Sequence, residues 1–361
     1  MEETKCKVEN CTNKNKTKTR RYSMVIIGLI LQIMLTACTQ ESSEPITKSA
    51  FALDTIINIT VYDNKSEKVL EEAIELIKKY ENIYSRTIET SELHKLNNRS
   101  LPSVSGKPNT FEISDELRSI IEYGLEYSNI SDGAFDITVE PVTSLWDFKS
   151  ENPKLPDESL IKEAINKVGY EGVILEGNTI SFKNEDIRIE LGAIAKGYIA
   201  DMVKEHLESK GVESGIINLG GNVLTLGEKN NKEPFKIGIQ KPFASRNEIV
   251  ASMDIVDKSV VTSGIYERYF VVDNKTYHHI LNPDTGFPFD NELISVTIIS
   301  PKSVDGDGLS TTCFALGLDQ GMDLVNSLDN IHAIFITKDY DFYYSEGFFE
   351  DINVEEIKDS K

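Results

Sequence analysis

An aspartate and a threonine four residues apart carry the clearest chemical signal in the chain. Asp307 and Thr311 belong to the run DGDGLSTT at 305–312, beside a helix that we expect over 309–318. Four residues make about one helical turn, so the carboxylate and the hydroxyl can face one point. Such oxygens suit Mg2+, which often takes one or two protein ligands plus phosphate and water. Spacing alone nevertheless favours a plain helix N-cap at Asp307 and a backbone-bonded hydroxyl at Thr311.

A second signal is a glycine-flanked helix start that carries a lysine. Apolar and polar residues alternate over 187–191, which is the period of a half-buried strand, and helical spacing follows over 193–210. A helix start has unpaired N–H groups, and Lys196 adds a positive charge there, so together they suit an anion. The strand expected over 215–219 opens into Gly-Gly-Asn at 220–222, where a ligand can approach the backbone. Ordinary turns and a solvated lysine fit the same residues.

Two adjacent histidines, His278 and His279, precede the turn NPDTG at 282–286. Neighbouring residues of a strand point to opposite faces, so at most one of the two can face a given pocket. We therefore expect no metal chelated by both. One histidine beside a phosphate would suit a general base or a hydrogen-bond donor, although a histidine in a strand is more often structural.

The order of the expected elements favours the α+β class. Strands and helices follow one another without regular alternation, so we expect mixed, largely antiparallel sheets with packed helices in a single large domain. The expected strands cover 51–62, 187–191, 215–219, 235–239, 249–256, 268–272, 277–281 and 293–300, with hairpins over 173–189 and 333–349. Helices are expected after Ser66 and Ser114, over 158–168 and from 193 and 309, whereas 85–97, 131–148 and 261–268 are expected to be irregular or turns.

The first 37 residues have the layout of a secretion signal. A basic segment precedes an apolar run at 24–35 that is too short to span a membrane comfortably, and LTAC at 35–38 resembles the lipobox of bacterial lipoproteins. We expect Cys38 to be lipidated and to anchor the chain to the outer face of the cell membrane. The expected division is a signal peptide (1–37), a polar tether (38–49), one domain (50–350) and an acidic tail (351–361).

Charge and cysteine content limit the possible partners and stabilising bonds. The formal net charge of −21 argues against a nucleic-acid partner. Cys6 and Cys11 would leave with the signal peptide and Cys38 would carry lipid, so Cys313 alone would remain. We therefore expect no disulfide within the mature chain.

Several motifs together resemble, in order, those of the ApbE family, over roughly residues 50–345. Members of that family are FAD:protein FMN transferases and are often lipoproteins. The motifs are GAFD at 133–136 with TVEP at 138–141, ELGAIAKGY at 190–198, NLGGN at 218–222, TSG at 262–264, HI at 279–280 with PDTG at 283–286, and DGLST at 307–311. An ordered series is far more specific than any single motif.

The resemblance implies that FAD is bound with Mg2+ on its diphosphate. The FMN half would then pass to a threonine hydroxyl of an acceptor protein, forming a phosphoester and releasing AMP. By the same resemblance, the metal ligands are the Ala193 carbonyl, Asp307 and Thr311. The implied FAD contacts are Leu53, Ala134, Phe135, Asp136, Glu190, Lys196 and His279.

This chain departs from the family pattern at three places. Glu190 replaces the usual Asp, Leu53-Asp54-Thr55 replaces Met-Gly-Thr, and Thr87 replaces an aromatic residue of some relatives. The chain itself contains no acceptor motif, so we expect the threonine to belong to another, extracytoplasmic flavoprotein.

The catalytic roles are expected to fall on Lys196, His279 and Asp307. Lys196 would assist the leaving of AMP, and His279 or Asp307 would take the threonine proton. We favour His279, because a cation on Asp307 would lower its proton affinity. Two alternatives remain open, namely an Mg2+-dependent FAD pyrophosphatase that gives FMN and AMP, and a non-catalytic FAD-binding lipoprotein.

Overall fold

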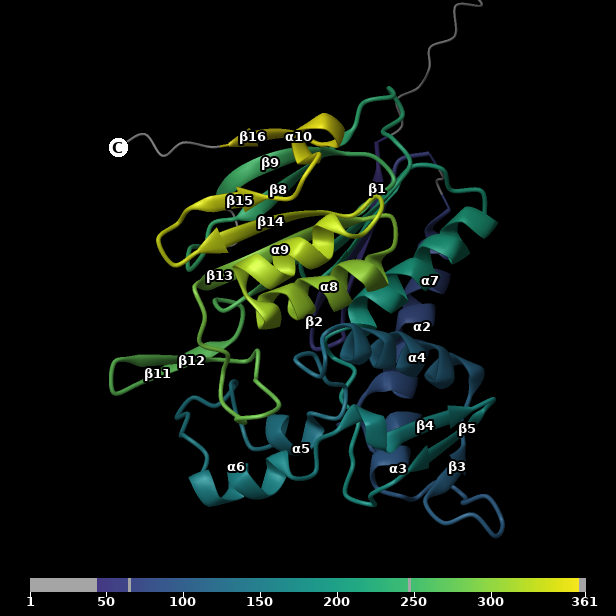
Figure 1. Cartoon of the computed structure of the whole chain (residues 1–361). Helices are drawn as coiled ribbons and strands as arrows, with labels where there is room; N and C mark the ends of the chain where they lie inside the picture. Colours follow the sequence, from purple (N-terminus) through teal and green to yellow (C-terminus); the bar gives the residue numbers. More distant parts are fainter. Residues whose placement is uncertain (1–43, 64–65, 246–247, 357–361) are drawn as a thin grey trace, which may run out of the picture. The chain divides into compact units, whose positions relative to one another are not determined.

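An antiparallel sheet of eight strands runs through the computed structural model, which describes residues 44–63, 66–245 and 248–356 (Figure 1). Its strand order is β1-β2-β6-β7-β10-β13-β14-β15. The strands are β1 (Ile46–Ala52), β2 (Thr55–Val61), β6 (Gly215–Leu219), β7 (Asn222–Leu226), β10 (Ser259–Gly264), β13 (Leu293–Ser300), β14 (His332–Thr337) and β15 (Phe342–Tyr344). All eight residues of β13 are buried, because both faces of the sheet are covered at this strand.

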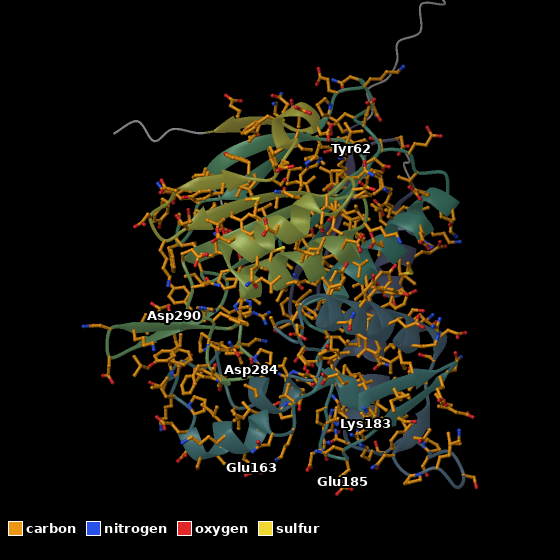
Figure 2. The ribbon with its side chains drawn as sticks, in the orientation of Figure 1. Tyr62, Glu163, Lys183, Glu185, Asp284 and Asp290 are labelled. Atoms are coloured by element: carbon orange, nitrogen blue, oxygen red, sulfur yellow. The ribbon has the colours of Figure 1, made fainter. Side chains whose placement is uncertain are left out.

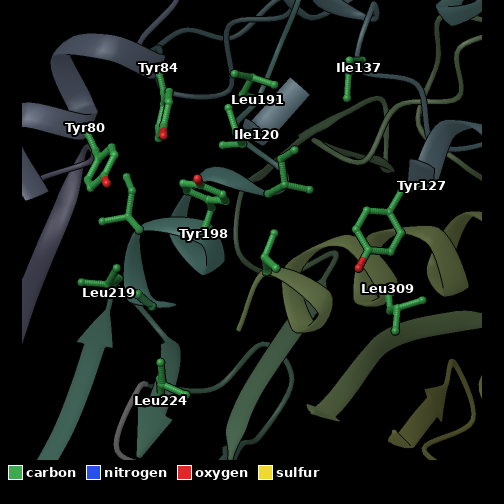
Figure 3. Close-up of a cluster of buried hydrophobic side chains, with 14 of the residues drawn as sticks. Tyr80, Tyr84, Ile120, Tyr127, Ile137, Leu191, Tyr198, Leu219, Leu224 and Leu309 are labelled. Carbon is green, nitrogen blue, oxygen red and sulfur yellow. The ribbon is translucent and has the colours of Figure 1, made fainter. Parts of the chain in front are cut away.

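Helices cover one face of this sheet, and a smaller sheet covers part of the other. The helices on the sheet are α2 (Glu67–Tyr84), α7 (Ala195–Ser209), α8 (Ser303–Leu316) and α9 (Leu318–Asn326), and α4 (Asp115–Ile130) packs on α2 and α8. The smaller sheet has the order β16 (Asn353–Glu356), β9 (Ile249–Ile255), β8 (Phe235–Gln240), and it shares an apolar cluster with β10, β13 and β14. In the helical layer, the rings of Tyr80, Tyr84 and Tyr198 pack together and join α2 to α7 (Figure 3).

Two further regions lie at the periphery of these layers. One contains the sheet β3 (Thr110–Glu112), β5 (Thr179–Phe182), β4 (Val173–Glu176), with α3 (Glu92–Asn97) and a 3-10 turn at Tyr170–Gly172. The other, which we call the aromatic satellite, joins α5 (Glu140–Thr143), α6 (Glu158–Ile165) and the hairpin β11 (Tyr269–Val272) and β12 (Lys275–His278) around its own apolar cluster, which includes Trp146. Glu163 on α6 and Asp284, in the loop after β12, mark this region in Figure 2. None of the helices in the described ranges is long and apolar enough to cross a membrane.

The expected α+β class and the largely antiparallel sheets are confirmed. Ser114 caps α4 as expected, since its Oγ accepts from the Leu117 N–H. The expected helix after Ser66 is α2, and the closing hairpin is β14 and β15.

The expected strand over 51–62 is wrong, because this segment belongs to a hairpin. Strands β1 and β2 are joined at Leu53 and Asp54, whose φ angles are +53° and +62°. Two consecutive positive φ values are typical of a tight type I′ turn. Strand β1 therefore begins inside the segment expected to be a tether, and α10 (Phe348–Asp351) with β16 extends into the expected acidic tail. The signal peptide and Cys38 lie outside the described residues.

The expected strand over 187–191 is also wrong, although Ile187, Ile189 and Leu191 are buried as its alternation predicted. The Asn97 side chain bonds both backbone groups of Ile189, donating to the carbonyl at 2.8 Å and accepting from the N–H at 2.8 Å. A side-chain amide thus replaces the neighbouring strand that the sequence pattern suggested.

Three further boundaries differ from expectation. The helix expected from Leu309 begins at Ser303, so Asp307 lies in its second turn and is not its N-cap. The segment 85–97 contains α3, and residues 262–264 end the central strand β10 where a turn was expected.

Candidate flavin and metal site

Helices α7 and α8 approach each other closely at Gly197. A Cβ atom at this position would lie 2.2 Å from the Ser303 carbonyl oxygen, so only glycine permits this contact. At the same point, the Gly197 N–H donates to Asp307 Oδ2 at 2.5 Å. The expected helix start and the expected aspartate, 110 residues apart in the sequence, thus meet directly.

Asp307 is a carboxylate in the protein interior, with a side chain that is 4% exposed. Its Oδ1 accepts from Asn222 Nδ2 at 3.0 Å and lies 3.9 Å from Lys196 Nζ. Burial raises the pKa of Asp307, whereas Lys196 and the two hydrogen bonds act in the opposite direction. The net rise shows that these partners compensate only part of the cost of burying the charge.

The surrounding oxygens fit a hard cation. In a regular helix the Gly197 N–H would bond the Ala193 carbonyl, but it bonds Asp307 instead, and no N–H within the described ranges donates to that carbonyl. Thr311 lies one turn after Asp307 on α8, and its Oγ1 is 3.1 Å from Ser263 Oγ. A carboxylate, a hydroxyl and a carbonyl that lacks a protein donor are ligands of the kind Mg2+ takes.

The number of these ligands also fits Mg2+. Across the part of the chain that the structure describes, no three acidic, histidine or cysteine side chains come together as a metal-binding group. A cation held by few protein oxygens completes its shell with phosphate and water, which is the usual arrangement for Mg2+.

His279 lies at the base of the aromatic satellite. Its Nδ1 is 3.2 Å from the Arg268 carbonyl oxygen, which can only accept, so Nδ1 carries the proton and Nε2 is an acceptor. Burial, Arg268 and His278 lower the pKa of His279 to about 3, and Lys196 adds to this effect. The positive charge of Lys196 thus acts on the protonation of His279. The neighbouring His278 points elsewhere, with Nε2 bonded to the Phe289 carbonyl.

The loop at 134–136 uses its side chains within the protein. Asp136 accepts from the N–H and hydroxyl of Thr138, both at 2.6 Å, and from the Tyr170 N–H at 3.1 Å. Burial raises the pKa of Asp136 against these hydrogen bonds. The Phe135 ring is buried against Tyr127. Ala134 alone of the three lines a surface pocket of about 510 Å³, beside the end of α8.

At one of the three departures from the family pattern, Leu53-Asp54-Thr55, a hydrogen bond and ion pairs hold the first two residues. The Leu53 N–H donates to Glu81 Oε1 at 2.7 Å, while Asp54 pairs with Lys149 and Arg268. The Asp54 contact ties the β1–β2 turn to the residue whose carbonyl holds His279.

Glu190 makes a second set of contacts. Its Oε1 accepts from the Gly192 N–H at 2.8 Å, and its Oε2 pairs with Arg86. Arg86 also lies 3.5 Å from Glu140. The longer side chain at position 190 therefore folds back onto the loop that leads to Ala193.

The geometry agrees with comparisons to known proteins. The model of the ApbE family matches residues 53–335. The chain belongs to the ApbE family. It is 37% identical over 299 residues to an FAD:protein FMN transferase of Klebsiella pneumoniae (strain 342), covering 82% of this chain and 90% of that protein. An FAD:protein FMN transferase of Treponema pallidum (strain Nichols) is 29% identical, covering 85% and 89%.

Solved ApbE structures share the fold. The ApbE protein of Thermotoga maritima aligns with a TM-score of 0.76 and 32% identity, covering 85% of this chain and 99% of that one. The flavin transferase ApbE of Vibrio cholerae aligns with a TM-score of 0.75 and 26% identity, with the same coverage. The family and the fold expected from the motifs are therefore confirmed, whereas the individual ApbE site residues stay predictions.

The sequence did not indicate the roles of two residues that organise the candidate site. Asn222 was noticed only as part of a glycine-rich turn, yet its side chain bonds Asp307. Asp201 was not noticed, although it accepts from two N–H groups of α8. The available signal was its position on α7, one turn after Gly197, facing the same neighbour.

Proposed function

We propose that this chain is an FAD:protein FMN transferase that uses Mg2+ and attaches FMN to a threonine hydroxyl of an acceptor protein. The observation that carries the proposal is the meeting of α7 and α8, which brings the start of α7, with Lys196, to Asp307 on α8, one turn before Thr311. We propose that Asp307, Thr311 and the Ala193 carbonyl bind the metal. The names of the similar proteins support the transfer of flavin.

The reaction breaks the diphosphate of FAD between its two phosphorus atoms. A bond forms between the threonine oxygen and the phosphorus of the FMN half, and AMP leaves with the bridging oxygen. When bound, Mg2+ supplies charge neutralisation at the diphosphate. Lys196 is placed to offset negative charge on the same group, because its ammonium is partly exposed and only 3.9 Å from Asp307.

His279 is the proposed acceptor of the threonine proton. With Nδ1 bonded to the Arg268 carbonyl, Nε2 has a free lone pair. The low pKa of His279 keeps the imidazole neutral at pH 7 and thus able to accept a proton, although it makes a weak base. A diphosphate nearby would raise that pKa, because an anion favours the charged imidazolium.

We further propose that Cys38 anchors the enzyme by lipid on the outer face of the cell membrane. The support is the order of basic, apolar and small residues before Cys38 and the polar segment after it. Replacing Cys38 with serine should release the protein from the membrane fraction, and unchanged membrane association would count against lipidation at this residue.

Mass spectrometry of an acceptor domain tests the reaction. A domain with a threonine flavinylation motif is incubated with the protein, FAD and Mg2+, while AMP and FMN are assayed. We expect an FMN adduct on the threonine and an equal amount of AMP, both lost in Asp307→Ala. Release of AMP and free FMN without an adduct would instead indicate a pyrophosphatase, and FAD binding without turnover would indicate a flavin carrier.

A further inference from the structure

We propose that Asp201 is a positioning residue that sets the register of α7 against α8 and so places the Ala193 carbonyl and Asp307 for one cation. This inference rests on the metal site of the proposed function. It concerns a residue that would touch neither the metal nor the flavin.

Asp201 caps α8 from a neighbouring helix. Its Oδ1 accepts from the Ser303 N–H at 2.7 Å and its Oδ2 from the Val304 N–H at 2.9 Å. The residue at the N-cap of α8 is Lys302. Its ammonium can only donate hydrogen bonds, so it cannot accept from these two N–H groups. The carboxylate of Asp201 therefore serves as the N-cap that the sequence of α8 lacks.

The cap and the metal-site contact have the same spacing on both helices. Gly197 and Asp201 are four residues apart on α7, and their partners Asp307 and Ser303 are four residues apart on α8. The pairs run in opposite directions, as expected for helices that cross antiparallel. Two contacts one turn apart fix both the sliding and the crossing angle of the two helices, whereas a single contact would let them pivot about it.

A second route leads from the same cap to Asp307. Ser303 Oγ donates to Asn222 Oδ1 at 2.8 Å, and Asn222 Nδ2 donates to Asp307 Oδ1 at 3.0 Å. Ser259 Oγ lies 2.9 Å from Ser303 Oγ and joins β10 to this chain of buried side chains. A shift of Ser303 would therefore turn the Asp307 carboxylate as well as move its helix.

The cap depends on a charge that protonation would remove. Burial raises the pKa of Asp201 to about 6, against the hydrogen bonds from Ser303 and Val304. Asp305 raises this pKa further, Lys204 lowers it, and Lys302 also interacts with Asp201. Below about pH 6 the side chain becomes neutral and loses one acceptor, so it then resembles asparagine.

Calorimetric titration of the full chain with Mg2+ tests the inference, using wild type, Asp201→Asn, Asp307→Ala and Asp157→Asn. The last is a matched control, because Asp157 caps α6 through the Ser159 N–H, away from α7 and α8. At pH 7.5 we expect Asp201→Asn to bind Mg2+ about tenfold more weakly, and Asp157→Asn to bind like wild type. The deficit of Asp201→Asn should shrink at pH 5.5, where wild type has lost the same charge.

The outcomes separate this inference from the metal site itself. If Asp307→Ala binds Mg2+ as wild type does, the metal site is wrong. If Asp307→Ala loses binding but Asp201→Asn keeps wild-type affinity at both pH values, the positioning role is overturned, even where Asp201→Asn melts at a lower temperature. A loss in Asp201→Asn equal to that in Asp157→Asn also contradicts it, because any lost helix cap would then suffice.

Discussion

The contacts that hold Asp307 lie in the protein interior, whereas those around His279 end in exposed ion pairs. On the α7–α8 side, the partners of Asp307 are a backbone N–H and a buried amide, and a Cβ at Gly197 would have no room. On the other side, the Arg268 carbonyl holds His279, and the Arg268 side chain pairs with Asp54, which is half-exposed.

The difference indicates a division of labour between the two halves. Metal ligands must keep a fixed spacing, and buried hydrogen bonds with close backbone contact hold spacing well. In the proposed reaction the acceptor protein brings its threonine to the site from outside, which suits a small satellite cluster with a charged rim. We therefore expect substitutions to have large, salt-independent effects in the α7–α8 half and small, salt-sensitive effects at the rim.

The largest effect is expected from Asp307→Asn. Flavin transfer should fall by at least about a hundredfold, because the cation loses its charged ligand. The melting temperature in EDTA should fall only modestly, because the change removes a buried charge but leaves either the Gly197 N–H or the Asn222 amide without its acceptor. Asp319→Asn, an exposed change in the first turn of α9, is the control and should leave both unchanged. A large loss of stability in Asp307→Asn would contradict the comparison.

Gly197→Ala should cost about 1–3 kcal/mol of unfolding free energy, measured by urea denaturation, because backbone atoms of Ser303 would have to move. The matched control is Gly124→Ala in α4, whose Cβ would meet the Ile137 side chain at 2.5 Å. A side chain can rotate away, so the control should lose less. Equal losses of unfolding free energy would mean that the Ser303 backbone moves aside as easily as the Ile137 side chain.

In the α7–α8 half, the sequence could predict local features but not those that depend on packing between helices. The start of α7 was predictable because its apolar spacing is local, and Gly211, at φ +78°, ends the helix as expected. The first turns of α8 were missed because glycines at 306 and 308 have low helix propensity. They are needed for packing, since a Cβ at Gly308 would lie 2.2 Å from the Tyr127 ring.

The meeting of distant residues could not be predicted from spacing. Spacing placed Asp307 and Thr311 on one helix face, but only the family resemblance associated them with Ala193. The clamp of Asn97 on Ile189 joins residues 92 positions apart, and no local pattern encodes it. Polar side chains that bond backbone at long range are therefore where local reasoning failed here.

A smaller effect is expected from His279→Gln, and it should depend on pH. The folded pKa of about 3 lies below the ordinary value of 6.5, so acid protonates this side chain in the unfolded chain first. The histidine should cost up to about 2 kcal/mol of stability at pH 5 and almost none at pH 8. Urea denaturation at both pH values should show that His279→Gln gains stability relative to wild type only at the lower pH. An identical difference at both pH values would mean that folding does not lower the pKa of His279.

The smallest effect is expected from Asp54→Ala at the rim. Its ion pairs with Lys149 and Arg268 involve side chains that are about half exposed, so the change should cost less than about 1 kcal/mol. Salt should remove most of that cost, because the Debye length falls to about 3 Å at 1 M. Urea denaturation at about 0.05 M and 1 M salt would measure both quantities. A cost that persisted at high salt would contradict the comparison. It would mean that the turn at Leu53, which has a positive φ, depends on Asp54 as well as on the hydrogen bond from the Leu53 N–H to Glu81.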